Sequence, residues 1–286
     1  MADPALRRHI EAREFVLAPG VYDLISAKLA DRMGFRALYV TGYGAVASHL
    51  GLPDAGLATY RDMLERVAQI VAMTHTPVIA DADTGYGGLL NVAHTVRGYE
   101  AAGVSAIQIE DQVFPKKCGH TPGRRVIATE EMVRRLRVAC DSRASADCLI
   151  VARTDARTAH GLDAALARAE AYAAAGADIL FVEAPESVEE LRRIAAALDV
   201  PVLANMVPGG RTPVLGAAEL EAMGFALAIH PAAGFLSAAA AMDRSYAALA
   251  GGAQPETAVP FHDFDGFNRL MGFEEVWDFE RRYGEG

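Results

Sequence analysis

The chain has 286 residues, and its composition of 52% hydrophobic and 22% charged residues indicates a globular protein with a large core. A formal net charge of −10 argues against surfaces that bind nucleic acid or an anionic membrane, and an acidic ligand would require local positive charge or a metal ion. No signal core or membrane-spanning stretch is visible, and the spacing of Cys118, Cys140 and Cys148 matches neither a disulfide framework nor a metal site, so we expect a cytoplasmic protein.

Short apolar runs recur along the chain, and segments of helical period separate them. The runs predict eight buried strands, at residues 15–18, 37–41, 78–83, 106–111, 149–154, 179–183, 202–206 and 227–230. Helices are predicted between them, among them residues 23–33, 162–175 and 188–198. Eight strands that alternate with helices predict an α/β fold, the (β/α)8 barrel. An open doubly wound sheet is the rival, but no Gly-x-Gly-x-x-Gly follows the first strand.

A long connection, residues 40–57, follows the second predicted strand. It begins with Thr41-Gly42-Tyr43-Gly44, whose backbone N–H groups can surround an anion. A Gly-rich turn of this kind also serves simply to reverse the chain. The residues by themselves leave both interpretations open.

Further segments follow the eighth predicted strand. Residues 232–249 predict a helix, residues 251–260 a Gly/Pro linker, and residues 261–283 carry an aromatic tail. We therefore divide the chain into a catalytic barrel, residues 1–250, and a C-terminal helical extension, residues 251–286. A closed barrel does not need this extension, so we expect its exposed aromatic side chains to cover a neighbouring subunit.

Polar residues stand at the strand ends that converge on one site in a (β/α)8 barrel. They are Asp81, Asp83, Glu110, Arg153, Glu183, Asn205 and His230. The carboxylates of Asp81, Asp83 and Glu110 are hard oxygen ligands that suit Mg2+ or Mn2+. Arg153 suits bidentate recognition of a substrate carboxylate. Each acidic residue alone can equally be a helix N-cap, but their convergence with Arg153 favours a metal and substrate site.

The fourth predicted strand leads into a loop that carries Lys116, Lys117, Cys118, Gly119 and His120. The lysines and the histidine would favour the thiolate of Cys118, and Gly119 allows the backbone to bend. A divalent cation that chelates a 2-oxo or 2-hydroxy acid stabilises an enolate, and a nearby thiol can then add or remove a proton at the adjacent carbon. A solvated basic loop with an incidental cysteine is the alternative.

An ordered set of motifs resembles the isocitrate lyase/phosphoenolpyruvate mutase superfamily. The resemblance covers roughly residues 19–249, and it rests on Gly51-Leu52-Pro53-Asp54, Asp81-Ala82-Asp83-Thr84-Gly85-Tyr86-Gly87, Lys116-Lys117-Cys118-Gly119-His120, Ala152-Arg153-Thr154-Asp155-Ala156, Phe181-Val182-Glu183-Ala184 and Leu203-Ala204-Asn205-Met206. It implies that Asp83 holds Mg2+ directly and that Asp81 and Glu110 hold it through water. It also implies a homotetramer in which a C-terminal helix is exchanged between subunits.

The resemblance assigns roles to the other site residues as well. It implies a catalytic group with Cys118 as acid/base, Arg153 on the 2-oxo acid moiety, and His120 and Glu183 as polar supports. It further implies that the carboxylate of a 2-oxo acid moiety lies among Thr41, Gly42 and Tyr43. The remaining residues expected around the substrate are Tyr39, Asp54, Gly119, Asn205 and Pro231.

The activity expected from the resemblance is Mg2+-dependent cleavage of a carbon–carbon bond. The Cys-Gly-His loop and residues 205–213 resemble the lyases of 2-alkylmalates such as 2,3-dimethylmalate, which release a 2-oxo acid and a carboxylic acid. Leu236 stands where methylisocitrate lyases carry an arginine, and Pro231 where oxaloacetate hydrolases carry a hydroxyl residue. Both of these activities and a carboxyphosphonoenolpyruvate phosphonomutase remain alternatives, and a barrel that binds dicarboxylates without turnover is the non-enzymatic one.

Overall fold

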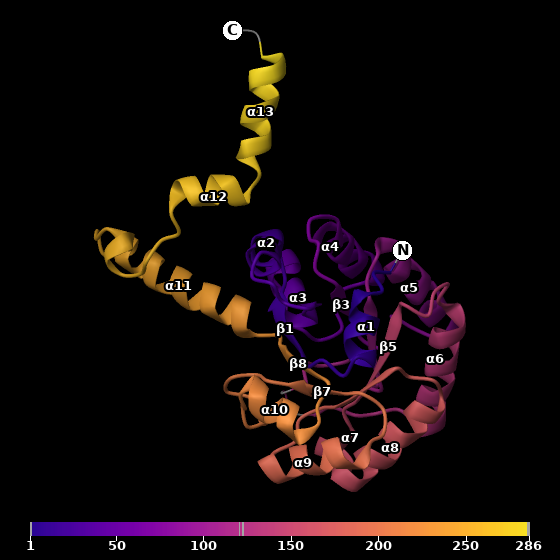
Figure 1. Ribbon diagram of the computed structural model, residues 1–286. Helices are drawn as coiled ribbons and strands as arrows, with labels where there is room; N and C mark the ends of the chain where they lie inside the picture. The colour runs from indigo at the N-terminus through magenta and orange to yellow at the C-terminus, as the bar shows by residue number, and fades with distance from the viewer. Residues whose placement is uncertain (1, 120, 122, 285–286) are drawn as a thin grey trace. The chain divides into compact units, whose positions relative to one another are not determined.

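The computed structural model describes residues 2–119, 121 and 123–284. Its centre is a closed barrel of eight parallel strands, each paired with the next and the eighth with the first (Figure 1). The strands are β1 (Val16–Val21), β2 (Leu38–Val40), β3 (Val78–Asp81), β4 (Ala106–Glu110), β5 (Leu149–Thr154), β6 (Ile179–Val182), β7 (Val202–Asn205) and β8 (Leu227–His230). The predicted (β/α)8 barrel is therefore confirmed.

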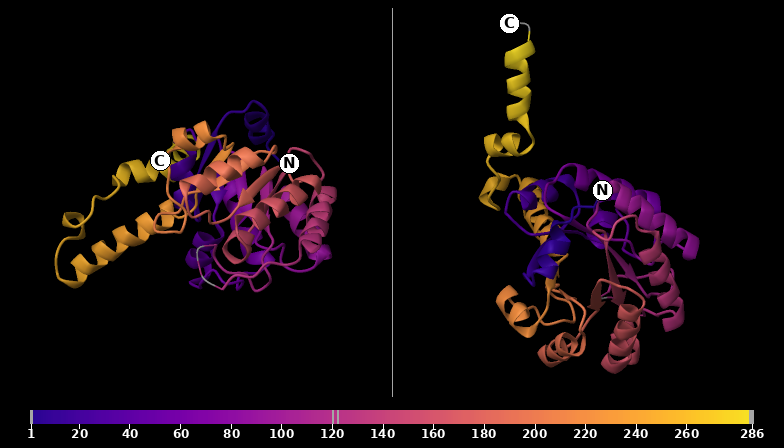
Figure 2. Two further views of the ribbon diagram at one scale, coloured as in Figure 1. Left: turned by 90° about the horizontal axis from the view of Figure 1, so that it is seen from below. Right: turned by 45° about the vertical axis from the view of Figure 1, so that its right-hand side comes forward.

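Helices form a ring outside the strands, as Figure 2 shows most clearly in its right-hand view. Side-chain caps begin several of them: Asp23, Thr59 and Ser187 each accept a hydrogen bond from a backbone N–H of the first turn. The helices of the barrel unit are α1 (Ala5–Glu11), α2 (Leu24–Asp31), α3 (Gly42–Leu50), α4 (Tyr60–Ala72), α5 (Leu89–Ala102), α6 (Thr129–Ser142), α7 (Ala156–His160), α8 (Leu162–Ala174), α9 (Val188–Ala197) and α10 (Ala217–Met223).

The strands bury both faces, and the two faces serve different cores. Alternate residues, such as Leu149 and Val151 of β5, belong to a cluster in the barrel interior. The residues between them, such as Ile150 and Ala152, belong to the larger cluster that includes the helices. Every second residue of a strand faces the barrel interior, so the last residue of such a series lies at the carboxyl end of the barrel. Arg153 is the next member of the β5 series.

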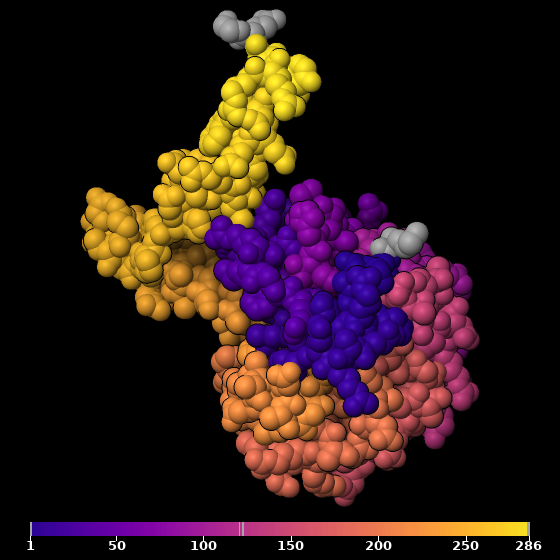
Figure 3. All heavy atoms as spheres, in the orientation of Figure 1, coloured from indigo at the N-terminus to yellow at the C-terminus, as the bar shows by residue number. Residues whose placement is uncertain are grey.

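Helix α1 covers the opposite end of the barrel, where the strands begin. Its Leu6 is fully buried in the interior cluster, beside the first residues of several strands. Arg7 donates to the carboxylate of Asp178, which directly precedes β6, at 3.2 Å. Figure 3 shows the indigo N-terminal segment lying across this face. The amino-terminal end of the barrel is thus closed by packing and ion pairs.

One sequence-based strand boundary was wrong, and one connection contains a helix that the residues alone did not indicate. The first strand was expected to stop before Pro19, but β1 runs through Gly20 to Val21. A Cβ on Gly20 would lie 2.3 Å from the carbonyl oxygen of Pro231, so this glycine permits close packing and does not make a turn. The connection at residues 40–57 contains α3, which ends at Leu50 and is followed by Gly51 in the left-handed conformation.

The chain divides into two compact units, Met1–Gly234 and Phe235–Gly286, and each is described by itself. The second unit contains most of α11 (Ala233–Ala250), a short 3-10 helix (Pro255–Thr257), α12 (Phe264–Leu270) and α13 (Phe273–Tyr283). None of the described residues of α11, α12 and α13 is buried. Large exposed side chains of this unit include Tyr246, Phe261, Phe264, Trp277, Phe279 and Tyr283. Among the helices of the described residues, none has the length and apolar character needed to cross a membrane.

Candidate active site

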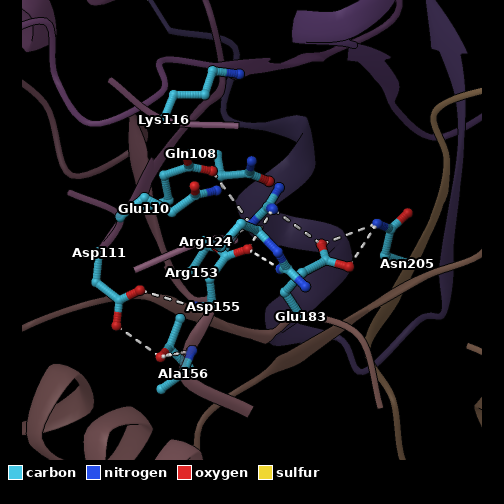
Figure 4. A network of polar contacts seen from close by, with 12 residues as sticks. Gln108, Glu110, Asp111, Lys116, Arg124, Arg153, Asp155, Ala156, Glu183 and Asn205 are labelled. Carbon is cyan, nitrogen blue, oxygen red and sulfur yellow. Dashed lines mark hydrogen bonds and ion pairs between the residues drawn. The ribbon is translucent and has the colours of Figure 1, made fainter. Parts of the chain in front are cut away.

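The predicted strand-end residues lie at the carboxyl ends of the parallel strands, and Figure 4 shows Glu110, Arg153, Glu183 and Asn205 among them. Glu110 and Arg153 are direct neighbours across the β4–β5 pair, because they share one register position. Glu183 and Asn205 continue the interior-facing series of β6 and β7, and Asn205 donates to a Glu183 carboxylate oxygen at 3.1 Å. His230 differs from this group, since it alternates with the interior-facing Leu227 and Ile229. All of these residues except His230 are less than a tenth exposed.

Arg153 is the central cation of the site. Its Nε and Nη2 donate to the two carboxylate oxygens of Asp155 at 2.9 and 3.0 Å. Weaker ion pairs at 3.4 Å connect it to Glu110 and Glu183, and its guanidinium lies 5.1 Å from the centre of the Phe181 ring. Burial opposes the charge, but the three carboxylates outweigh it and raise the pKa of Arg153 well above its ordinary value. Arg153 is therefore a fixed positive charge that can bind a substrate carboxylate.

The acidic residues of β3 and β4 form the other half of the site. The backbone N–H of Asp83 donates to Asp81 Oδ1 at 3.0 Å, and Gln108 Nε2 lies 3.4 Å from the same oxygen. Burial raises the pKa of Asp83 to about 7, although the ammonium of Lys116 works in the opposite direction. Burial also raises the pKa of Glu110 well above its ordinary value. A neighbouring cation stabilises the charged form of buried carboxylates whose pKa is raised in this way.

Lys116 provides that neighbour, and its position corrects a sequence-based expectation. The side chain was expected in a solvated basic loop or beside the thiol of Cys118. Instead it is 3% exposed, its ammonium lies 2.7 Å from Asp83 Oδ1, and it also pairs with Asp54. The many carboxylates keep its pKa well above the ordinary value despite burial.

These residues fit a divalent cation with few direct protein ligands. Within the described residues, no three His, Cys, Asp or Glu side chains already converge as a ready metal cage. However, Glu110 Oε1 is buried and accepts no hydrogen bond from any described residue, and the Asp83 carboxylate already binds a cationic group. Hard carboxylate oxygens of this kind suit Mg2+, which usually retains several water ligands. Asp83, Asp81 and Glu110 are therefore the residues that would hold it.

The start of α3 forms a further wall of the site. Thr41 is 3% exposed and precedes α3 in an extended conformation. The first backbone N–H groups of a helix have no partner within the helix, so those of α3 can bind an anion. A Cβ on Gly42 would lie 2.5 Å from Asp81 Oδ2, which explains why this position has no side chain. Tyr39, on β2, donates to Gln108 Oε1 at 3.2 Å. Tyr43 lies in the first turn and is 41% exposed.

The segment that carries Cys118 lies directly on the strand ends. The backbone N–H of Cys118 donates to the carbonyl of Asp54 at 3.1 Å. A Cβ on Gly119 would lie 2.4 Å from Arg153 Nη2 and 2.8 Å from Glu183 Cδ, so only a glycine permits this approach. Cys118, like Cys140 and Cys148, is a thiol. His120, expected to assist catalysis, lies outside the described residues.

Four buried residues near the site were not predicted from the sequence to have a role. They are Gln108, Asp111, Arg124 and Asp155. Gln108 had a detectable signal, because a glutamine inside the apolar run of β4 needs a hydrogen-bonding partner. Arg124 had none, since it stands beside Arg125 in a loop and the two look alike in the sequence.

Comparison with known proteins identifies the protein family to which this chain belongs. The phosphoenolpyruvate phosphomutase family matches residues 6–250, which is most of the chain. This chain belongs to that family, and the predicted membership of the isocitrate lyase/phosphoenolpyruvate mutase superfamily is confirmed.

Individual relatives narrow the class further. The chain is 48% identical to 2,3-dimethylmalate lyase of Eubacterium barkeri, over 98% of both chains. It is 42% identical to 2-methylisocitrate lyase of Aeropyrum pernix, over 98% of this chain and 89% of the relative. Among solved structures, 2,3-dimethylmalate lyase matches with a TM-score of 0.89 at 39% identity, over 99% of this chain and 96% of that one. Oxaloacetate acetylhydrolase with 3,3-difluorooxalacetate matches with a TM-score of 0.91 at 34% identity, over 99% and 98%.

Proposed function

We propose that this protein is a Mg2+-dependent carbon–carbon lyase that cleaves a 2-alkylmalate-type dicarboxylate, such as 2,3-dimethylmalate, into a 2-oxo acid and a carboxylic acid. The relatives confirm the lyase class, and 2,3-dimethylmalate lyase is 48% identical over nearly the whole chain. The observation that carries the proposal is the contact of the Cys118 segment with Arg153 and Glu183, beside the carboxylates of β3 and β4. This contact supports a site in which Cys118 acts as acid/base, Arg153 binds a carboxylate and the carboxylates of β3 and β4 hold a cation.

The residues of the chain divide the chemistry among them. Arg153 and the first N–H groups of α3, near Thr41 and Gly42, bind the carboxylate of the moiety that becomes the 2-oxo acid. Glu183 and Asn205 form a polar wall beside Arg153 and fix its orientation. Gly119 lets the loop backbone lie against this wall, which excludes water from the reacting carbons.

Cleavage requires one proton to leave and another to arrive. The substrate hydroxyl gives its proton to a carboxylate of the site, the bond between the hydroxyl-bearing carbon and its neighbour breaks, and the electron pair stays on that neighbour. We assign Cys118 as the acid that protonates this carbon, because its segment lies on the strand ends. Mg2+, when bound near Asp83, Asp81 and Glu110, supplies Lewis-acid stabilisation of negative charge on the substrate oxygens. Phosphonopyruvate hydrolase, a structural neighbour at 28% identity, has been solved with oxalate and Mg2+.

A substrate panel tests the function directly. We expect the purified protein with Mg2+ to release pyruvate from 2,3-dimethylmalate faster than it acts on 2-methylisocitrate or oxaloacetate. The reason is that Leu236 supplies no positive charge for a third carboxylate. A coupled dehydrogenase assay measures pyruvate release, and a calcium oxalate assay measures oxaloacetate hydrolysis. Faster turnover of either alternative would replace the substrate assignment.

We also propose a homotetramer in which the second unit packs on other copies of the chain. Its helices α11, α12 and α13 bury none of their described residues within one chain, and α13 carries Trp277 and Phe279 on its surface. Removal of the residues after Gly252 should reduce the assembled mass measured by light scattering. A monomeric full-length protein would contradict the proposal.

A further inference from the structure

Arg124 lies at the far end of the segment that carries Cys118, shortly before α6. It is 7% exposed, whereas its sequence neighbour Arg125 is exposed. A buried arginine without a carboxylate partner is strongly unfavourable, so its contacts must compensate for the loss of water. The contacts of Arg124 extend in two directions.

One direction leads to Arg153. Arg124 Nη1 pairs with Asp155 Oδ1, and Arg153 donates to both oxygens of the same carboxylate at 2.9 and 3.0 Å. Figure 4 shows Asp155 between the two guanidinium groups. Burial alone would raise the pKa of Asp155, but Arg153 and Arg124 together keep it lowered. One fully buried carboxylate therefore holds both arginines in fixed positions.

The other direction leads to Cys118. Arg124 Nε donates to the carbonyl of Thr121 at 3.2 Å. The backbone N–H and the hydroxyl of Thr121 in turn donate to the carbonyl of Cys118, at 3.0 and 2.7 Å. Arg124 Nη2 donates to the Thr158 hydroxyl of α7 at 2.7 Å, which anchors the guanidinium to the barrel.

We infer that Arg124 is a positioning residue that couples the placement of Cys118 to the placement of Arg153. Asp155 orients Arg153 on one side of Arg124, and Thr121 holds the Cys118 carbonyl on the other. The thiol and the substrate-binding guanidinium are then held at a fixed separation, although they are 35 positions apart in the sequence. This inference rests on the proposed function in one respect, the role of Cys118 as acid/base.

The test compares Arg124→Gln with Arg125→Gln, which removes the same charge one residue away, outside the network. For Arg124→Gln we expect kcat to fall about 100-fold, because a catalytic group displaced by an ångström loses about that much. KM should change far less, since Arg153 still binds the substrate. Arg125→Gln should keep the kcat of the unmodified protein. Arg124→Lys, which can keep the ion pair with Asp155 but not all three contacts, should give an intermediate kcat.

A second measurement needs no turnover. Alkylation of Cys118 by iodoacetamide, followed by mass spectrometry of its peptide, should be several-fold faster in Arg124→Gln than in Arg125→Gln, because the segment is no longer anchored. If the lyase assay fails for every substrate but this difference persists, the coupling stands and the activity assignment falls. Equal kcat values and equal alkylation rates in the two variants would overturn the inference.

Thr158→Val provides a variant for the case that Arg124→Gln does not fold. It removes one hydrogen bond to Arg124 and leaves the buried ion pair intact. It should accelerate Cys118 alkylation, to a smaller degree than the loss of the arginine. An alkylation rate identical to that of the unmodified protein would then count against the coupling.

Discussion

Both ends of the barrel carry charged side chains, but these side chains differ in how they are paired. At the amino-terminal end, Asp178 accepts from Arg7 at 3.2 Å, from Arg143 at 2.5 Å and from the Ile150 backbone N–H at 2.8 Å. At the carboxyl end, burial raises the pKa of Asp83 and Glu110, and Glu110 Oε1 accepts no hydrogen bond from a described residue. Charges that are fully paired stabilise a fold, whereas charges left partly unsatisfied are available for a ligand.

The comparison also separates two roles of a buried ion pair. The pairs of Asp178 connect α1 and the loop after α6 to the start of β6, so they hold elements together. The pair between Lys116 and Asp83 places an ammonium beside the carboxylate that we propose as a ligand of Mg2+. The first arrangement is expected to affect stability, and the second to affect activity.

The largest effect is expected from Asp83→Ala at the carboxyl end. Removal of this carboxylate deletes the direct ligand that we assign to the metal, so turnover should fall below detection while the circular dichroism spectrum stays native. EDTA should abolish the activity of the unmodified protein, and Mg2+ or Mn2+ should restore it. Full activity in the presence of chelator would show that the carboxyl end does not hold a catalytic metal.

Cys118→Ser should have the next largest effect. A hydroxyl is a much weaker acid than a thiol near neutral pH, and general acid–base catalysis is worth roughly 10²–10⁴-fold. We therefore expect kcat to fall within that range, while binding of a pyruvate-like ligand measured by calorimetry changes little. Near-normal turnover of the serine variant would remove Cys118 from the mechanism.

Asp178→Asn tests the amino-terminal end. It removes the charge that Arg7 and Arg143 share, and hydrogen bonds to charged groups contribute about 1–3 kcal/mol each. The free energy of unfolding in urea should fall by about that amount, with kcat unchanged when measured at 25 °C. If kcat falls instead and stability does not, the division of labour between the two ends is wrong.

Asp31→Asn should give the smallest effect, and it depends on pH. The Asp31 carboxylate accepts from the backbone N–H of His75 at 2.9 Å and from the Thr76 backbone and hydroxyl, both at 2.8 Å. Burial would raise its pKa, but these hydrogen bonds lower it below the ordinary value. A lowered pKa gives stability that is present above the unfolded-state pKa of about 3.9 and is lost as pH falls through the folded-state value.

The stability difference between this variant and the unmodified protein should therefore be largest near neutral pH. Urea unfolding at a neutral pH and at an acidic pH, both still native, measures it. A difference that grows on acidification would reverse the sign of the argument. Activity at neutral pH should not change, because Asp31 ends α2 at the amino-terminal side.

The sequence by itself determined the barrel and most of the polar residues at its carboxyl end. Eight apolar runs alternating with helical segments are local patterns, and a strand that ends in a polar residue identifies Asp81, Glu110, Arg153 and Asn205 without any knowledge of distant contacts. Closure of the barrel then brings these residues together, because parallel strands share one carboxyl end.

Only the tertiary structure decided which loop residues belong to the site. Lys116 and Lys117 are alike in the sequence, as are Arg124 and Arg125, yet one of each pair is buried. The partners that bury them, Asp54 and Asp83 for Lys116 and Asp155 for Arg124, lie between 31 and 62 residues away along the chain. Gly42 and Gly44 also suggest a turn in the sequence, although they begin α3 and Gly42 packs against Asp81. Whether a charged side chain is buried depends on the free energy of its long-range contacts. Local sequence propensity does not contain information about those contacts.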